Sequence, residues 1–271
     1  MEHNWRIETK LIQEGYKPGN GEPRVLPIYQ STTYKYDSTE HVAKLFDLEV
    51  PGHMYSRISN PTVEALENKI AALEGGVGAL CTSSGQSASM VAMLNLCEAG
   101  DHFIALNTIY GGTYNLFAIT FKKLGVEVSF VSPDATKEEV EKLIKPNTKA
   151  IFGETIANPA LVVLDIAYWS EIAHSYGIPL VVDNTFATPY LCRPFEHGAD
   201  IVTHSTTKYM DGHATSVGGV IVDSGKFDYT NGKFKGFTEP DDSYHGLTYT
   251  KAFGNAAYIT KARVCLLYTS P

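Results

Sequence analysis

The stretch Ala199-Asp-Ile-Val-Thr-His-Ser-Thr-Thr-Lys208-Tyr-Met-Asp-Gly-His213 contains an apolar run that ends in hydroxyl residues, and a lysine follows them directly. A second apolar run, Gly218-Gly-Val-Ile-Val222, comes after a short gap. This pattern predicts a strand, a loop and a second strand. The loop would hold Lys208 at the mouth of a sheet.

Lys208 and its neighbours have the chemistry to bind a cofactor that carries both an aldehyde and a phosphate. The lysine amine can condense with a carbonyl to form a Schiff base. The hydroxyls of Ser205, Thr206 and Thr207 can donate hydrogen bonds to a phosphate. Pyridoxal phosphate carries both groups, so the stretch predicts a pyridoxal phosphate site. The alternative is a solvated loop lysine, because lysines are mostly exposed.

Composition narrows the function classes. The chain has 271 residues, of which 44% are hydrophobic and 19% charged, so it has ample material for a core. Its net charge of −8 argues against nucleic acid or an anionic membrane surface as a partner. We find no long apolar segment and no secretory signal, so we expect no membrane partner and a cytoplasmic location. The four cysteines contain no CxxC pair, so we expect no metal site. The cysteines are Cys81, Cys97, Cys192 and Cys265.

Strand-like and helix-like segments alternate from Asn60-Pro61 onward. Asn60 is a plausible N-cap and Pro61 a good first helical residue. The repeated units predict an α/β fold with a largely parallel sheet, helices on both faces, and ligands beyond the carboxyl ends of the strands. The expected strands are 79–82, 102–106, 126–131, 149–153, 178–183, 200–204 and 218–222. The expected helices are 61–74, 111–121, 137–144, 166–176 and one that ends near Gly100.

The two ends of the chain lack this alternation. Residues 1–60 contain scattered prolines and tyrosines and are expected to form an extended, irregular arm that lies on a partner subunit, the alternative being a floppy terminus. Residues 61–256 are expected to form the cofactor-binding domain, with a long ordered loop up to Tyr249. A last helix is expected near Lys251, and 257–271 would begin a truncated C-terminal domain. The ending Val264–Pro271 breaks the helical pattern and resembles a non-native tail.

Polar residues follow several of the expected strands. Ser84-Gly85-Gln86 lies between a strand and a helix, where free backbone N–H groups and the helix dipole suit a phosphate. Asp183 ends a buried apolar strand, where it needs a partner such as a protonated pyridine nitrogen; a turn cap is the alternative. Asn158 follows another strand, or is an ordinary turn residue before a proline.

Two further residues are candidates on the type of side chain. Tyr110, just before two glycines, can stack on a cofactor ring, although it can equally be a packed aromatic residue. Arg57 offers a forked set of donors suited to phosphate, with a surface arginine as the alternative. Because Arg57 lies on the arm, the phosphate within its reach can be that of a neighbouring subunit.

The chain resembles the transsulfuration, or Cys/Met metabolism, family of pyridoxal phosphate enzymes from about residue 7 to 263. Gly236-Phe-Thr-Glu-Pro-Asp-Asp-Ser-Tyr-His-Gly-Leu247 is similar to the O-acetylhomoserine sulfhydrylase branch of that family. The motifs that carry the family resemblance are Tyr55-Ser-Arg-Ile-Ser-Asn-Pro-Thr62, Ser83-Ser-Gly-Gln-Ser-Ala88, Tyr110-Gly-Gly-Thr-Tyr-Asn115, Val181-Val-Asp-Asn-Thr-Phe-Ala-Thr-Pro189 and His204-Ser-Thr-Thr-Lys-Tyr-Met-Asp-Gly-His213.

The resemblance implies a fold-type I large domain and a role for each matching residue. Lys208 would be the Schiff-base lysine, Asp183 would pair with the pyridine nitrogen, and Asn158 would lie near the phenolic oxygen. Tyr110 would stack on the ring. The residues implied to hold phosphate are Gly85, Gln86, Ser205 and Thr207, with Tyr55 and Arg57 from a second subunit. The family is usually a tetramer of two such dimers, and its carboxylate-binding arginine lies in a C-terminal domain that this chain is expected to lack.

The implied reaction is γ-replacement on an activated homoserine ester, with sulfide or a small thiol as the second substrate. Lys208 would act as general base, and Tyr110 would assist the leaving group. The alternatives within the family are a cystathionine γ-synthase, a methionine or cystathionine γ-lyase, and a fragment that binds cofactor without catalysis. Those outside it are a nucleotide site at Gly75-Gly-Val-Gly78 and a metal site formed by histidines. The histidines are His197, His204 and His213.

Overall fold

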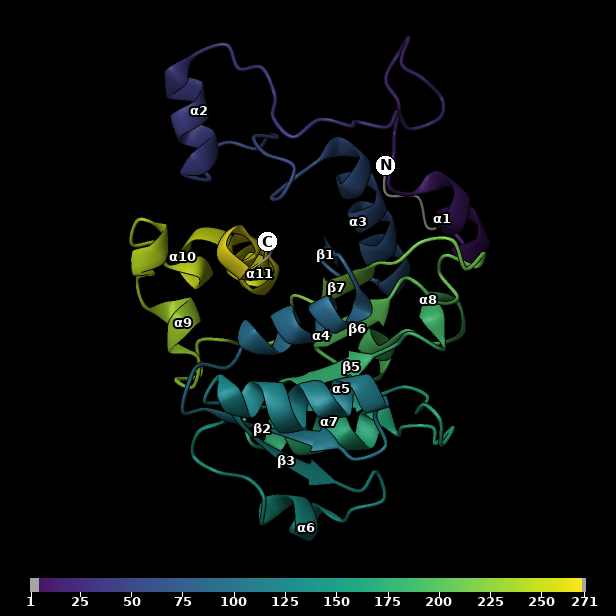
Figure 1. Ribbon diagram of the computed structural model, residues 1–271, viewed down its shortest axis with the longest axis vertical. Helices are drawn as coiled ribbons and strands as arrows, with labels where there is room; N and C mark the ends of the chain where they lie inside the picture. The colour runs from purple at the N-terminus through teal and green to yellow at the C-terminus, as the bar shows by residue number, and fades with distance from the viewer. Residues whose placement is uncertain (1–4, 270–271) are drawn as a thin grey trace.

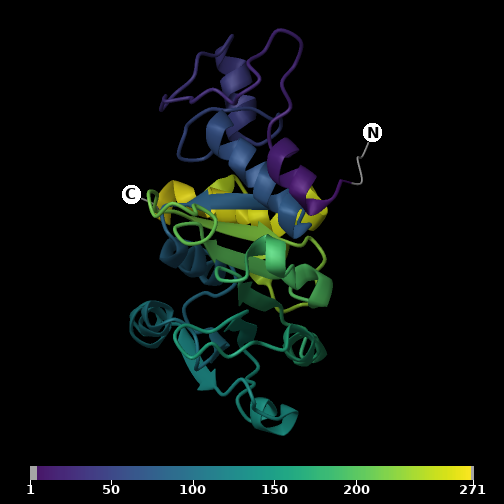
Figure 2. The ribbon, with the colours of Figure 1, turned by 90° about the vertical axis from the view of Figure 1, so that its right-hand side faces the viewer.

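The computed structural model describes residues 5–269, in which seven strands form one sheet with helices on both sides (Figures 1 and 2). The strand order is β1-β7-β6-β5-β4-β2-β3. The pairs from β6 to β3 are parallel, whereas β7 runs antiparallel to both β1 and β6. The α/β prediction with a largely parallel sheet is therefore confirmed. The strands are β1 (Gly78–Thr82), β2 (His102–Leu106), β3 (Glu127–Val131), β4 (Thr148–Glu154), β5 (Leu180–Asp183), β6 (Ile201–Ser205) and β7 (Gly219–Asp223).

The helices between these strands begin and end at residues that favour such positions. The Asn60 side chain accepts a hydrogen bond from the Thr62 backbone at the start of α3, and Gly75 ends that helix with a φ of 81°. The helices up to β7 are α3 (Pro61–Glu74), α4 (Gly85–Leu94), α5 (Gly111–Asn115), α6 (Lys137–Glu141), α7 (Ile166–Ser175) and α8 (Thr188–Leu191). A π-helix, η1 (Leu116–Phe121), continues α5, and a 3-10 helix, η2 (Pro194–His197), follows α8.

Alternation along β6 places α3 and α4 on opposite faces of the sheet. The site of a Cβ on Gly85, at the start of α4, lies 2.5 Å from Ser205 Cβ. The preceding residue, His204, instead contacts Glu74 of α3, with 2.6 Å between His204 Nε2 and Glu74 Oε1. Successive side chains of a strand point to opposite faces. With both faces covered, β4, β5 and β6 are almost entirely buried, which explains their nearly continuous apolar sequences.

The N-terminal arm is less irregular than the sequence predicts. Two short helices, α1 (Ile7–Gln13) and α2 (Thr39–Phe46), interrupt it, so the prediction of a wholly extended arm is wrong for these segments. Figure 1 shows α2 standing apart from the sheet at the top of the view. A small apolar cluster of Leu45, Met54 and Ile58 anchors it, separate from the main core.

The segment after β7 also contains more helix than expected. Its elements are α9 (Lys235–Thr238), η3 (Asp242–Tyr244), α10 (Tyr249–Phe253), η4 (Gly254–Ala256) and α11 (Ala257–Thr269). Because α11 continues through Thr269, the prediction that helical structure breaks off at Val264 is wrong, while Ser270 and Pro271 lie outside the described residues. Arg263 joins α11 to the rest of the chain through Glu67 Oε2 at 2.6 Å and Ile58 O at 2.7 Å. Between residues 5 and 269, none of the helices has the length and apolar character needed to cross a bilayer.

Candidate cofactor site

A cavity of about 270 Å³ lies at the carboxyl ends of the parallel strands. It brings together nine of the eleven residues predicted for the site, from the last residues of β5 and β6 and from the segments that follow β1, β2, β4 and β6. These nine residues are Ser84, Gly85, Gln86, Tyr110, Asn158, Asp183, Ser205, Thr207 and Lys208.

One end of the cavity has the features of an anion site. Ser84 caps α4 by accepting a hydrogen bond from the Ser87 backbone at 3.1 Å, so the helix begins at the cavity wall. The side-chain amide of Gln86, in the first turn of α4, donates to Thr113 Oγ1 at 2.9 Å, and this bond fixes the Gln86 side chain. The Thr207 hydroxyl, also in the cavity wall, exchanges two hydrogen bonds with the backbone of Gly218 and so joins the two ends of the loop that carries Lys208.

Gly85 leaves no room for a side chain. A Cβ at this position would lie 2.5 Å from Ser205 Cβ and 2.8 Å from Ser205 Cα. We therefore expect Gly85→Ala to displace α4 from β6, to lower the free energy of unfolding by about 1–3 kcal/mol, and to weaken binding of pyridoxal phosphate at least about tenfold. Urea unfolding and equilibrium dialysis measure the two effects. Gly111→Ala is the control, because nothing lies within 4 Å of its Cβ position; equal cofactor affinity in both variants would contradict this role of Gly85.

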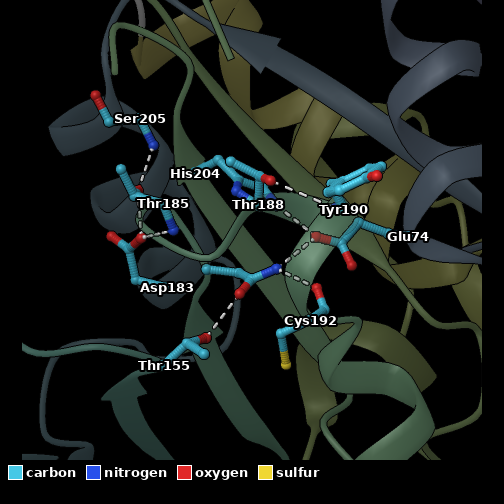
Figure 3. Close-up of polar contacts among 10 residues, drawn as sticks. Glu74, Thr155, Asp183, Thr185, Thr188, Tyr190, Cys192, His204 and Ser205 are labelled. Atoms are coloured by element: carbon cyan, nitrogen blue, oxygen red, sulfur yellow. Dashed lines mark hydrogen bonds and ion pairs between the residues drawn. The ribbon is translucent and has the colours of Figure 1, made fainter. Parts of the chain in front are cut away.

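Asp183, the last residue of β5, lines the same cavity. Its Oδ1 accepts hydrogen bonds from the backbone N–H of Thr185 at 3.0 Å and from the Thr185 hydroxyl (Figure 3). Burial raises the pKa of the Asp183 carboxyl, and the bonds from Thr185 oppose that rise. The turn-cap alternative is thus correct for one oxygen, and Oδ2 remains available for a cation or an N–H donor in the cavity.

Lys208 follows β6 on a turn that presents its side chain to the cavity. Its backbone N–H donates to Ser205 O at 3.3 Å, and its carbonyl accepts from Gly212 N at 3.1 Å. The side chain is exposed, and it lines the same cavity as Asp183. Lys208 is therefore an exposed loop lysine, but its loop lies at the cavity that also contains Asp183 and the start of α4.

Sequence reasoning missed Glu154, the last residue of β4. It is 9% exposed, lines the cavity, and lies beside Asp183 in the register of β4 and β5. Its Oε1 accepts from Tyr110 N at 2.7 Å and its Oε2 from Asn158 N at 3.3 Å. Burial, followed by the Asp183 charge, raises the pKa of Glu154 to about 8. The signal was available, because Glu154 ends an apolar strand just as Asp183 does.

The raised pKa of Glu154 predicts a pH-dependent stability. A carboxyl whose pKa rises from 4.5 to about 8 on folding stabilises the fold below pH 4.5, and this contribution is lost as the pH rises through 8. Glu154→Gln removes this ionisation. Between pH 5 and pH 9, the free energy of unfolding of the unliganded wild type should therefore fall by on the order of 3 kcal/mol more than that of the variant. Urea unfolding across that range tests this, with exposed Glu171→Gln as the control. Parallel profiles for Glu154→Gln and wild type would show the expectation to be wrong.

The cavity does not include Tyr55 or Arg57. Arg57 lies over the Tyr55 ring, 5.4 Å from its centroid, and lines another cavity of about 340 Å³ with Ser83 and Ser87. Further wall residues that the sequence did not suggest are Thr113, Ile156, Thr185, Phe186 and Val217.

The two other sites considered from sequence have different surroundings. Gly75 and Gly76 end α3 and precede β1, so they do not form a turn between a strand and the helix that follows it. His204 is buried against Glu74, and His213 contacts the carbonyl of Asp211. Within residues 5–269, no three His, Cys, Asp or Glu side chains are grouped so as to hold a metal ion.

The donor set fits pyridoxal phosphate. The capped start of α4 and the Ser205 and Thr207 hydroxyls suit the phosphate, the Lys208 amine suits the aldehyde, and Asp183 Oδ2 suits the ring nitrogen. Fold and cavity therefore define a class of α/β protein built to hold a small cofactor with an anionic tail and a cationic ring.

Comparison with known proteins identifies the family within that class. Residues 8–249 match the family described as Cys/Met metabolism PLP-dependent enzymes. The chain is 49% identical to the O-acetyl-L-homoserine sulfhydrylase of Leptospira meyeri and 51% identical to the homocysteine/cysteine synthase of Saccharomyces cerevisiae. These matches cover 97% and 96% of this chain but 62% and 60% of the relatives, so the chain spans about 60% of their length.

A solved structure agrees with this assignment. The crystal structure of a Campylobacter jejuni protein described as an O-acetylhomoserine (thiol)-lyase has a TM-score of 0.93 and 35% identity, over 98% of this chain and 66% of that one. That structure contains a pyridoxyl-lysine phosphate. The chain belongs to the Cys/Met metabolism family of pyridoxal phosphate-dependent enzymes, and the cofactor predicted from its residues is confirmed.

Proposed function

We propose that this chain carries the cofactor site of an enzyme that converts O-acetylhomoserine and sulfide, or a small thiol, to homocysteine, or its thioether, and acetate. The observation that carries the proposal is that Lys208, Asp183 and the capped start of α4 line one cavity. The names of the Leptospira and yeast relatives support the choice of substrates.

Each residue has a defined task in this reaction. Bound pyridoxal phosphate supplies an aldehyde for a primary amine and a ring that withdraws electrons from the adjacent carbon. Lys208 Nζ accepts the proton from the α-carbon of the substrate and moves protons at the β-carbon, so that acetate leaves the γ-carbon and sulfur takes its place. Tyr110, which is 48% exposed, lines the cavity, and its hydroxyl would assist the departing acetate.

We propose further that Tyr55 and Arg57 serve the phosphate of a second copy of the chain. They lie on the arm, and neither lines the cavity of its own chain, which supports a site shared between subunits. The expected assembly is a dimer of dimers.

In keeping with the sequence, we propose residues 1–60 as the arm, 61–256 as the cofactor-binding domain and 257–271 as the start of the C-terminal domain. The location is proposed to be cytoplasmic, and no disulfide joins the cysteines of the described part of the chain.

A substrate comparison tests the function. The purified protein with pyridoxal phosphate should form homocysteine and acetate from O-acetylhomoserine and sulfide, faster than it releases ammonia from methionine or cystathionine. Faster ammonia release would assign the chain to a lyase. Cofactor binding without either product, from this chain and from a version extended at its C-terminus, would contradict the proposed reaction.

A further inference from the structure

Thr185 lines the cavity, and its hydroxyl both accepts and donates a hydrogen bond. Its Oγ1 accepts a hydrogen bond from the backbone N–H of Ser205 at 2.8 Å and donates one to Asp183 Oδ1 (Figure 3). An N–H can only donate, so the hydroxyl proton must point toward Asp183. Oδ1 therefore accepts from Thr185 twice, through backbone and side chain, and any proton on Asp183 must lie on Oδ2.

The neighbouring residue, Asn184, fixes the segment that carries Thr185 through several hydrogen bonds. This residue is fully buried, and its side chain accepts from Thr155 Oγ1 at 2.8 Å and donates to Glu74 Oε1 at 3.0 Å and to Cys192 O at 2.9 Å. Its backbone N–H donates to Thr203 O at 2.9 Å. These four hydrogen bonds anchor the backbone that carries Thr185 beside β6.

This arrangement distinguishes Thr185 from a residue that only fills space. Its hydroxyl connects the backbone of Ser205, on β6, with the carboxylate of Asp183, on the neighbouring strand β5. A carboxylate held at a single oxygen by a backbone N–H alone could rotate about its terminal bond. A second donor on the same oxygen restrains that rotation and keeps Oδ2 aimed in one direction.

We propose that Thr185 is a positioning residue that orients the Asp183 carboxylate toward the ring nitrogen of pyridoxal phosphate, with the Ser205 backbone as its anchor. The inference rests on the cofactor placement given under the proposed function. It assigns Thr185 no contact with the reacting atoms.

A ligand pair isolates this role. Pyridoxal phosphate and its carbocyclic analogue, in which a C–H group replaces the ring nitrogen, differ only in the atom that Asp183 would contact. The ratio of their dissociation constants therefore measures how well Asp183 meets that nitrogen. Thr185→Val keeps the shape of the side chain and removes both hydroxyl bonds, whereas Thr185→Ser keeps the hydroxyl.

We expect wild type and Thr185→Ser to prefer pyridoxal phosphate over the analogue to a similar degree, and Thr185→Val to lose at least about tenfold of that preference. If Thr185→Val does not fold, as judged by circular dichroism, Thr185→Ala carries the same expectation. An unchanged ratio in the folded variant, or a Thr185→Ser variant that behaves like Thr185→Val, would overturn the inference alone. A wild-type protein that binds neither ligand would overturn the cofactor placement as well.

Discussion

Replacing Lys208 with alanine should lower kcat for homocysteine formation at least about 1,000-fold, the largest loss that we expect from any single substitution. The amine is the group that would meet the cofactor aldehyde and then move protons on the substrate. Because the side chain is exposed, the melting temperature of the unliganded protein should change little. Steady-state kinetics and thermal unfolding of the same preparations measure the two quantities.

Two further variants separate the amine from its charge. Lys208→Arg keeps a positive charge in the cavity but offers a group that does not deprotonate in proteins, so it should be as inactive as the alanine variant. Lys123→Ala, at an exposed lysine away from the cavity, should retain wild-type activity. Substantial activity in Lys208→Arg would show that charge, and not the amine, is what the site requires.

Asp183→Asn should weaken the binding of pyridoxal phosphate and lower kcat about 100-fold or more, because the ring nitrogen loses its anionic partner in a buried site. The amide oxygen can still accept both bonds from Thr185, so the local geometry is preserved. The same change should make the unliganded protein more stable above neutral pH. Burial raises the pKa of the Asp183 carboxyl, and the cost of ionising it in the folded state grows as the pH rises.

This combination of lost binding and gained stability distinguishes a functional carboxylate from a structural cap. Equilibrium dialysis with pyridoxal phosphate and urea unfolding at pH 6 and pH 9 provide the comparison. Asp228→Asn is a suitable control, because Asp228 is exposed, lies outside the cavity, and has a pKa lowered by the side-chain and backbone hydrogen bonds from Thr230. If Asp183→Asn binds cofactor like wild type and unfolds more easily, Asp183 is a turn cap and nothing more.

The sequence predicts the sheet well because its strands are short, apolar and bounded by polar or glycine residues. For example, the apolar side chains of Val181 and Val182 predict a buried strand, and Asp183 after them marks the carboxyl end of that strand. The direction of β7 could not be predicted, since parallel and antiparallel strands buried on both faces have the same composition. The helix α2 was missed because only one of its residues, Leu45, is buried, and it packs in a small local cluster and not in the main core.

The same reasoning explains which site residues were found. Asp183 stands out as a polar residue that directly follows an apolar run, and Lys208 as a lysine just after the hydroxyl residues that end another such run. Glu154 obeys the same rule and should have been found by it. Thr185 carries no such signal, because its role depends on the distance from β5 to the Ser205 backbone, which only the folded chain defines. The positions of Tyr55 and Arg57 relative to a second copy lie beyond a single chain and remain a proposal.

Trapping the lysine that bonds to the cofactor tests the central claim most directly. The protein is incubated with pyridoxal phosphate, reduced with borohydride and digested, and the modified peptide is identified by mass spectrometry. The account predicts one stable pyridoxyl group, on Lys208, and none in the Lys208→Ala variant. A label on a different lysine, or a cofactor-loaded protein that borohydride leaves unmodified, would contradict it.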